Sequence, residues 1–402
     1  MSEHELTGDA ACVLAVNAGS SSIRFALYDL ANPLRLRARG KIDRIGLPGA
    51  KLAVDNSTGT RARSGAIDAR THRGAANSLI AWLEKARLLP AIKAVGHRVV
   101  HGMKHSEPAR ITPKLLSELR SITPYAPDHL PHEIALIESF ARLRSKPPQV
   151  ACFDTAFHRT MPRVARLLPI PRRYTAKGVE RYGFHGLSYA YLQEELARLD
   201  PRATKGRVIF AHLGNGASLA AVHDGKSIDT SMGFTPTAGL VMGTRTGDLD
   251  PGLVYYLARS GRMTAARFQQ MVNHESGLLG VSGTSSDLRD LLARENRDLR
   301  AAEAVALFCY QAKKWIGSFA AALGGLDTLV FAGGIGENAP IVRKRICDGL
   351  GFLGIELDRK RNAKNAPLIS QQAGRVKVRV IRTDEELMIA RSVTRVLRLG
   401  SE

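Results

Sequence analysis

Two stretches of the chain, 195 residues apart, share one pattern of apolar strand, small-residue turn and second strand. They read CVLAVNAGSSSIRFALYD from residue 12 and RVIFAHLGNGASLAAVHD from residue 207. At this offset Val13 aligns with Val208, Gly19 with Gly214 and Asp29 with Asp224. Each stretch predicts a β-hairpin whose glycine turn lets the backbone approach a ligand. Because strand-glycine-strand patterns are common, the match is either a coincidence or the remnant of a duplicated domain.

The remaining periodicity predicts mixed α/β structure in both halves. Strands are expected at 38–42, 91–100, 149–157, 327–333 and 376–384, and helices at 112–120, 132–143, 188–199, 250–261, 300–325 and 385–397. Thr112 and Asp250 each precede a proline and are expected to cap a helix. A chain of 402 residues favours two domains. If the last helix packs on the first half, the domains are 1–154 completed by 386–402, and 155–385.

Composition indicates a soluble globular protein, with 44% hydrophobic and 24% charged residues. Lys and Arg outnumber Asp and Glu by 58 to 37, and the net charge of +21 attracts anions. These basic residues are scattered and no aromatic residues are interleaved among them, which argues against nucleic acid as a partner. Phosphorylated small molecules remain natural ligands.

The four cysteines, Cys12, Cys152, Cys309 and Cys347, form no CxxC pair and lie beside apolar residues. They are expected to be reduced and buried, as in a reducing compartment. The N-terminal residues MSEHELTGDAA do not resemble a signal peptide, and no apolar run approaches 18 residues. The chain is therefore expected to be cytoplasmic, without a membrane partner.

Glycine-rich loops follow several predicted strands. FAGGIGENAP is expected to form a strand, a glycine turn and a helix start capped by Asn338, where backbone N–H groups attract anions. The same segment contains Gly334-x-Gly336-x-x-Ala339, a loose dinucleotide fingerprint, and a purely structural tight turn is a further possibility. HLGNGAS, from residue 212, is similar, with glycines that free the backbone to surround phosphate oxygens.

Charged residues and a histidine stand in comparable loops. Arg98 in GHRVVHG and Arg245 in MGTRTGDLDPG are each either surface arginines or two-pronged ligands of a carboxylate or phosphate. His185 in RYGFHG lies where core packing gives it little purpose. Asp154 in FDTAFH ends an apolar strand, where α/β folds bind ligands. Glu385 in TDEE begins a helix, as a favourable helix charge or a magnesium ligand.

Taken together, these loops describe a site for a nucleoside triphosphate and its transferred phosphate. Two alternatives remain open. The fingerprint at Gly334 would suit a nicotinamide-dependent dehydrogenase, which leaves the arginine loops unused. An actin-like ATPase that switches partner binding would need a partner-binding region beyond the two halves.

The motifs in combination resemble the acetokinase family. They are VNAGSSS, GHRVVHG, FDTAFH, RYGFHG, HLGNGAS, DTSMGFTP, MGTRTGDLDP, HESGLLGVSGTSSDLRD, GGIGEN and TDEELMIA, in the family's order from residue 16 to 390. The resemblance implies a duplicated ribonuclease-H-like fold of the actin and hexokinase type, with an inter-domain cleft. It also implies the reversible reaction of ATP and acetate to acetyl phosphate and ADP, with Mg²⁺ or alternatively Mn²⁺. A homodimer and a metabolic link to a phosphate acetyltransferase are implied as well.

The same resemblance assigns roles to individual residues. Asn17 and Glu385 match the family's magnesium site, and Arg98 and Arg245 its ligands for the carboxylate and the transferring phosphate. His185 and Asp154 match the histidine and the essential aspartate beside the phosphoryl group. The remaining matches are Val100, Phe184 and Pro236 around the substrate methyl group, and His212, Leu213, Gly214, Asn215, Gly216, Asp287, Leu288, Arg289, Gly334, Ile335, Gly336, Glu337 and Asn338 around the nucleotide. Arg24 is also expected to bind the nucleotide.

This chain also departs from the family pattern. Arg24 stands where a lysine is usual, and Asp128 occupies the place of an apolar pocket leucine. Further departures are Met103, Leu187, Tyr189, Thr237 and Ala238. The preferred acid is therefore acetate or propionate, since one methylene changes selectivity by only ~1 to 3 kcal/mol. Direct in-line transfer is favoured over a covalent phosphoenzyme.

Overall fold

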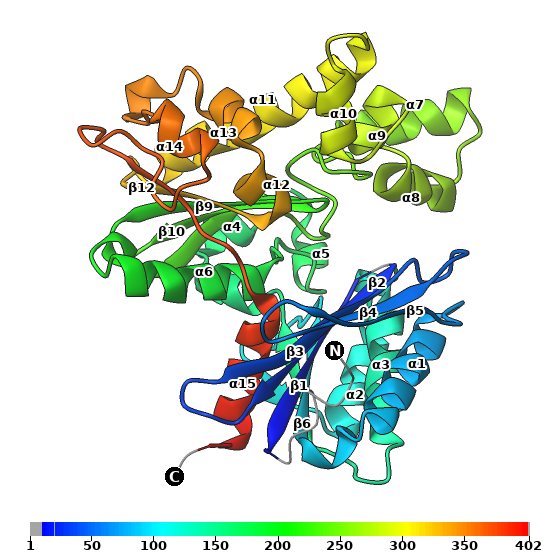
Figure 1. The fold of residues 1–402 in the computed structure, drawn as a ribbon. Coiled ribbons are helices and arrows are strands. Elements are labelled where there is room, and N and C mark those ends of the chain that lie inside the picture. Colours follow the sequence, from blue (N-terminus) through cyan, green and yellow to red (C-terminus); the bar gives the residue numbers. More distant parts are fainter. Residues whose placement is uncertain (1–9, 20, 401–402) are drawn as a thin grey trace. The chain divides into compact units, whose positions relative to one another are not determined.

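The computed structural model describes residues 10–19 and 21–400, and the chain divides into two compact units (Figure 1). The first unit extends to Ala156 and includes the C-terminal segment from Asp384. The second unit extends from Phe157 to Thr383. The first unit is thus built from two separate parts of the sequence.

The first unit contains an eight-stranded sheet in the order β5-β4-β3-β2-β1-β6-β8-β7. Its strands are β1 (Cys12–Ala18), β2 (Ser22–Asp29), β3 (Arg35–Asp43), β4 (Lys51–Asn56), β5 (Arg61–Ala66), β6 (Ile92–Val99), β7 (Ala109–Arg110) and β8 (Gln149–Phe153). Its helices are α1 (His72–Lys85), η2 (Leu89–Ala91), α2 (Pro113–Ser121), η3 (Thr123–Tyr125), α3 (Leu130–Ala141) and α15 (Glu385–Leu397). Strands β1, β6 and β8 are parallel, so their carboxyl ends lie at one edge.

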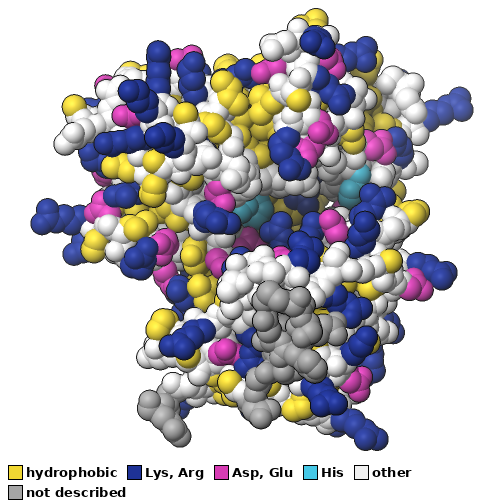
Figure 2. Space-filling model, in the orientation of Figure 1, with side chains coloured by type: hydrophobic (Ala, Val, Ile, Leu, Met, Phe, Trp, Pro, Cys, Tyr) yellow, Lys and Arg dark blue, Asp and Glu magenta, His cyan; other side chains and the backbone are white. Residues whose placement is uncertain are grey.

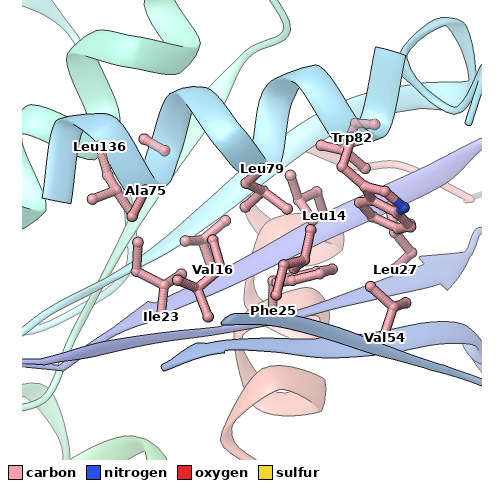
Figure 3. Close-up of a cluster of buried hydrophobic side chains, with 14 of the residues drawn as sticks. Leu14, Val16, Ile23, Phe25, Leu27, Val54, Ala75, Leu79, Trp82 and Leu136 are labelled. Atoms are coloured by element: carbon pink, nitrogen blue, oxygen red, sulfur yellow. The ribbon is translucent and has the colours of Figure 1, made fainter. Parts of the chain in front are cut away.

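The core on one face of this sheet is apolar (Figure 3). Trp82 and Leu79 of α1 point toward Leu14 of β1 and toward Phe25 and Leu27 of β2, and all five side chains are buried. Alternation along β1 and β2 places one set of side chains on this face, as expected for strands covered by a helix.

The opposite face of the sheet is covered by α15, which contacts β1, β2, β6 and β8. Gly96 of β6 makes this close approach possible, because a Cβ there would overlap the side chains of Ile389 and Val393. A larger residue at position 96 would push α15 away from the sheet.

The second unit contains a five-stranded sheet in the order β11-β10-β9-β12-β13. Its strands are β9 (Arg207–Leu213), β10 (Ala217–His223), β11 (Lys226–Thr230), β12 (Thr328–Ala332) and β13 (Lys377–Val380). Its longer helices are α6 (Gly186–Leu199), α7 (Gly252–Ser260), α8 (Ala265–His274), α10 (Leu288–Arg294), α11 (Leu299–Ala322) and α13 (Pro340–Cys347). The shorter ones are α4 (Arg163–Arg166), α5 (Arg172–Thr175), η5 (Ala203–Lys205), α9 (Gly277–Ser282), α12 (Gly333–Asn338), η6 (Gly351–Leu353) and α14 (Arg359–Ala363), and η4 (Ala156–Thr160) begins at the unit boundary.

Helices cover both faces of the second sheet, α11 on one and α6 on the other (Figure 1). Tyr189 and Leu192 of α6 are buried in one cluster with Val208 and Phe210 of β9 and Val330 of β12. This packing fixes the start of α6 relative to the ends of the strands.

The two sheets share one topology. The strands β3-β2-β1-β6-β8 and β11-β10-β9-β12-β13 follow each other in the same order. In both, the first three are antiparallel and the last three are parallel. The hairpins predicted from the 195-residue offset are β1–β2 and β9–β10, at matching places. The predicted duplication and the α/β fold class are confirmed.

Two local predictions were wrong. Asn338 was expected to cap a helix, but it is the last residue of α12, and α13 is preceded by Ala339. The expected glycine turn is therefore a short helix. Asp250 was expected to be the N-cap of α7, but Pro251 holds that position, although Asp250 Oδ1 still accepts the Gly252 N–H at 2.6 Å.

The surface carries its positive charge in a dispersed form. Figure 2 shows Lys and Arg side chains spread over the visible face, with Asp and Glu among them. Within the part of the chain that the structure describes, none of the helices has the length and apolar character needed to cross a bilayer.

Candidate functional site

Three of the expected site residues of the first unit lie at the shared edge of its parallel strands. Asn17 lies near the end of β1, Arg98 near the end of β6, and Asp154 directly after β8. Glu385 is the first residue of α15, and Asn17 Nδ2 donates to its Oε2 at 2.7 Å. The fold thus brings together residues that are up to 368 positions apart.

Arg98 is held by a buried carboxylate. Its Nη2 and Nε donate to Asp154 Oδ2 at 2.5 and 2.9 Å, and its Nη1 donates to the Ala18 carbonyl at 3.0 Å. Burial alone would lower the pKa of Arg98, but the charges of Asp154 and Glu385 raise it above its ordinary value. The guanidinium therefore stays charged, and its orientation is set before any ligand arrives.

Glu133 is a buried acid that the sequence analysis did not single out. Both of its carboxylate oxygens accept the Val100 N–H, at 3.0 and 3.2 Å. Burial raises the pKa of Glu133 to about 8, and the charge of Arg98 opposes this rise. The signal was present, because Glu133 shares a helical face with Leu136, Ile137 and Phe140, where a charge is unusual.

Carboxylate oxygens that could bind a metal ion lie around Asn17. The Nδ2 of Asn17 also donates to Glu386 Oε1 at 3.1 Å. The pKa of Glu386 is raised, mainly by burial and to a smaller extent by the charge of Glu385. Among residues 10–19 and 21–400, no three His, Cys, Asp or Glu side chains are grouped so that they could hold a metal ion. An amide and two carboxylates nevertheless fit Mg²⁺, which takes one or two protein carboxylates and completes its shell with water and phosphate.

Arg24 of β2 lies opposite Asn17 in the register of the hairpin. It is exposed, and its charge lowers the pKa of Glu386, against the larger effect of burial. Asp128, another departure in this unit, is half-buried. Burial lowers the pKa of His132, and the charge of Asp128 opposes this decrease. His132 stacks on His72 with ring centroids 3.9 Å apart, and His72 Nε2 lies 2.8 Å from the Gly19 carbonyl.

In the second unit, His185 and Arg245 both lie beside Gly216. A Cβ built on Gly216 would stand 3.3 Å from His185 Nε2 and 3.9 Å from Arg245 Nη1. The ring of His185 also lies 4.5 Å from that of His212. His185 has a left-handed backbone, with φ of 60°, and precedes the first residue of α6. This arrangement places two nitrogen-bearing side chains against Gly216, which has no side chain of its own.

The corner before α6 is fixed by buried hydrogen bonds. His158 Nε2 lies 3.1 Å from the Phe184 carbonyl, and its Nδ1 lies 2.9 Å from Ser227 Oγ. Gly183 has φ of 73° and packs directly against His158, so it has no room for a Cβ. Phe184 is buried, and its neighbour His185 is consequently held in position.

The loop that carries Arg245 is tied to the start of α9. Leu278 N–H and Ser276 N–H donate to the carbonyls of Met242 and Thr244 at 2.8 and 3.0 Å. Arg245 Nη1 donates to the Pro236 carbonyl at 3.4 Å. Of the three residues expected around the substrate methyl group, Pro236 and Phe184 belong to the second unit. Val100 belongs to the first unit.

The two glycine-rich loops of the second unit meet. Gly214 N–H donates to the Gly216 carbonyl at 3.0 Å, which closes the turn between β9 and β10. A Cβ on Gly214 would lie 4.0 Å from the Gly334 nitrogen, and Gly333, with φ of 75°, packs against the Leu213 backbone. The start of α12 consequently faces the hairpin turn.

Hydrogen bonds from side chains fix the other residues of α12. Glu337 Oε1 accepts the Gly333 N–H at 3.1 Å, and Asn338 Nδ2 donates to the Gly334 carbonyl at 2.9 Å. Arg343, which the sequence analysis did not single out, is fully buried and donates to the Gly336 and Glu337 carbonyls at 2.7 and 3.1 Å. Ile335 lies between these anchored residues.

Arg343 also bonds the side chains of Asn362 and Asn365, at 2.9 and 2.6 Å. Burial lowers its pKa to about 10. One of three basic residues in a short helix gave no sequence signal for this role.

The segment with Asp287, Leu288 and Arg289 begins α10. Asp287 is the N-cap and accepts the Arg289 N–H at 2.9 Å, and Leu288 is buried. The Arg289 side chain is exposed and folds back on Asp287. The preceding Ser286 carbonyl lies beside Gly243, which in turn lies against Asn215. The structure thus connects this segment to the glycine turn through Gly243.

Comparison with known proteins gives matches over nearly the whole chain. The sequence model of the acetokinase family matches residues 12–391. A protein named acetate kinase, from Methylocella silvestris, is 44% identical over 398 residues, covering 96% of this chain and 98% of the relative. One named propionate kinase, from Citrobacter rodentium, is 43% identical over 391 residues, covering 96% of each chain. The crystal structure of Porphyromonas gingivalis acetate kinase superposes with a TM-score of 0.86 at 38% identity, covering 96% of this chain and all of that one.

Proposed function

Because the chain belongs to the acetokinase family, we propose that it is a phosphotransferase with a carboxyl acceptor. In the proposed reaction, ATP and acetate give acetyl phosphate and ADP reversibly. The observation that carries the proposal is the partly buried Arg98, oriented by Asp154 and Ala18. Family membership also removes the reason to invoke the dehydrogenase or the partner-switching ATPase.

The reaction needs charge neutralisation more than acid-base catalysis. A substrate carboxylate, with a pKa near ~4 to 5 by analogy with side-chain carboxyls, is already an anion at neutral pH. It must approach a phosphate that is also anionic. Arg98 uses three of its five N–H groups within the protein, which leaves donors for the incoming carboxylate.

On the side of the nucleotide, the glycine turn at 213–216 and the start of α12 supply backbone N–H groups for phosphate oxygens. Arg245 and His185, which flank Gly216, are proposed to bind the equatorial oxygens of the transferring phosphoryl group. Val100, Phe184 and Pro236 are proposed to contact the methyl group, and Asp287 to Arg289 the adenosine. Transfer is proposed to be direct, since Asp154 is engaged with Arg98.

A divalent cation is part of the proposal. Asn17 and Glu385, with Glu386 beside them, would hold Mg²⁺, and Mn²⁺ takes similar oxygen ligands. When bound, the ion neutralises negative charge that develops on the phosphate oxygens. Arg24 is proposed to add positive charge for the nucleotide at the same hairpin.

Propionate is a second candidate acceptor. The relative from Citrobacter rodentium, named propionate kinase, is nearly as similar to this chain as those named acetate kinase. Because one methylene is worth only ~1 to 3 kcal/mol, activity with both acids is expected.

The proposal is tested by trapping acyl phosphates. Purified protein is incubated with MgATP, hydroxylamine and formate, acetate, propionate or butyrate, and the hydroxamate is measured. Acetate or propionate should give the highest rate. If no acid gives hydroxamate above a blank without enzyme, the protein is not an acyl kinase.

A homodimer is also proposed. Helices α7 and α8 contain no buried residue in the described chain, and Val254, Tyr255 and Tyr256 are 43, 66 and 64% exposed. A second copy of the chain would bury this apolar face, which a monomer leaves in water. Sedimentation should give twice the chain mass of 43.6 kDa. Tyr255→Glu with Tyr256→Glu should give the monomer, and a monomeric wild type would contradict the proposal.

We propose that the protein is cytoplasmic, which suits four cysteines that are all buried and unpaired with one another.

The acyl phosphate product would be consumed or supplied by an enzyme that exchanges phosphate for a thiol carrier, such as a phosphate acetyltransferase.

A further inference from the structure

Two buried hydroxyl groups connect α6 and β10 behind His185. His185 Nδ1 lies 2.8 Å from Ser218 Oγ, and Ser218 Oγ lies 2.5 Å from the hydroxyl of Tyr189. Both Ser218 and Tyr189 have 0% exposure. Tyr189 stands one helical turn after His185, and its N–H donates to the His185 carbonyl at 3.0 Å. The three side chains therefore form one continuous chain of hydrogen bonds, which is buried at Ser218 and Tyr189 and partly buried at His185.

The backbone of His185 fixes the direction in which its side chain leaves the chain. The left-handed conformation of His185, the Phe184 carbonyl held by His158 and the tight packing of Gly183 together fix the direction of its Cα–Cβ bond. With Nδ1 bound to Ser218, Nε2 points to the Gly216 turn and Arg245. The orientation of the ring is consequently set by Ser218.

We infer that Tyr189 and Ser218 are positioning residues that set the tautomer of His185. The Tyr189 O–H donates to Ser218 Oγ, the Ser218 O–H donates to His185 Nδ1, and the ring carries its proton on Nε2. A phenol is the more acidic hydroxyl and the better donor, so this direction is favoured over its reverse. The partner of one ring nitrogen decides which nitrogen holds the proton.

This inference deepens the proposed function and rests on it for its consequence. An Nε2–H that faces the glycine turn is a donor aimed at the phosphoryl oxygens, and it needs no imidazolium. Without the Ser218 hydroxyl, a neutral ring would keep only the weak intrinsic preference of histidine for this tautomer, and a fraction of the rings would present a lone pair to an anion. Tyr189, which departs from the family pattern, thereby has a defined role in this chain.

The tautomer itself can be observed by ¹⁵N NMR of protein labelled at histidine, with the His185 signals assigned by their loss in His185→Gln. In the wild type, Nε2 should be protonated and Nδ1 should have the shift of a hydrogen-bonded acceptor. Ser218→Ala should shift His185 to a mixture of tautomers, and Tyr189→Phe should do so in part. A wild-type ring protonated on Nδ1 alone would overturn the inference, whatever the variants do.

Kinetics supply a second measurement. Ser218→Ala should lower kcat roughly 10- to 100-fold with little change in the KM for ATP, as expected for the loss of a group that orients a site residue. Ser218→Thr retains the hydroxyl and should recover most of the rate. Matched controls are Ser139→Ala and Tyr182→Phe, which remove hydroxyls bonded to backbone carbonyls elsewhere.

Full activity in Ser218→Ala, with the His185 tautomer unchanged, would refute the role of Ser218. The NMR result does not depend on turnover, so the two proposals fail separately. A wild type that makes no hydroxamate but shows the Nε2–H tautomer would contradict only the proposed reaction.

Discussion

Glu133 accepts the backbone N–H of Val100 with both carboxylate oxygens, and it is 2% exposed. This buried acid lies next to a residue proposed to contact the substrate. Its pKa is raised to about 8, chiefly by burial.

Glu133 should make stability depend on pH. Between its ordinary pKa of 4.5 and about 8, the native state holds a proton that the unfolded chain has released. The free energy of unfolding should therefore fall as pH rises through this window. Urea unfolding should be measured at pH 5 and at pH 8. Between these two values the wild type should lose more stability than Glu133→Gln does. The exposed Glu84→Gln is the control, and equal differences at both pH values would contradict the prediction.

Removal of either arginine that is proposed to bind the carboxylate or the phosphate should abolish most of the turnover. Arg98→Ala and Arg245→Ala should each lower kcat by at least ~100-fold, because each removes a charged donor for the transferring group. Hydroxamate assays measure this, and circular dichroism confirms folding. Turnover in Arg198→Ala should be unaffected, since this exposed arginine bonds Glu195 on the same helix. Near-normal turnover in Arg98→Ala or Arg245→Ala would remove that residue from the mechanism.

Gly216→Ala should reduce activity without unfolding the protein. The new methyl would stand 3.3 Å from His185 Nε2 and would occupy the space proposed for an anion between His185 and Arg245. Gly317→Ala is the matched control, because among the described residues no atom beyond the neighbouring helix backbone lies within 4 Å of a Cβ there. That substitution, inside α11, should raise stability by about 0.5 to 1 kcal/mol and leave kcat unchanged. An active Gly216→Ala would show that the turn does not need open space.

Arg343→Met should affect both stability and nucleotide binding. The carbonyls of Gly336 and Glu337 would lose their charged donor, and the free energy of unfolding should fall by at least ~3 kcal/mol. The KM for ATP should rise, because α12 would no longer be anchored. Arg345→Met, in the same helix, removes only a partly exposed pair with Glu295 and should leave KM unchanged. Equal KM values in Arg343→Met and the wild type would separate Arg343 from the nucleotide site.

The sequence predicted the fold best where local chemistry and pattern agree. The two hairpins were predicted because strand alternation and glycine turns are local features. Thr112 was expected to cap α2, and its Oγ1 accepts the Leu115 N–H at 3.2 Å. The segment GGIGEN was expected to be a turn because glycine disfavours helices. Tertiary contacts override that preference, since the carbonyls of α12 are bound by the buried Arg343.

The site could be predicted only where a residue type is conspicuous in its loop. Arg98, Arg245 and His185 stand out among glycines, and their assigned roles remain predictions. Ser218 and Tyr189 could not be found in this way, because a serine in a strand and a tyrosine in a helix have ordinary packing roles. Their function depends on a side-chain contact between α6 and β10, which only the three-dimensional structure reveals.

The packing of α15 on β1, β2, β6 and β8 also affects how the chain is made. The first unit needs this helix, yet α15 follows the whole second unit in the sequence. During synthesis on a ribosome, domains fold from the N-terminus as they emerge. Here the first sheet must wait, with the face around Gly96 uncovered, until the second unit has been translated. Glu385 arrives at Asn17 in the same late step, so a nascent chain cannot complete the proposed metal site before α15 emerges.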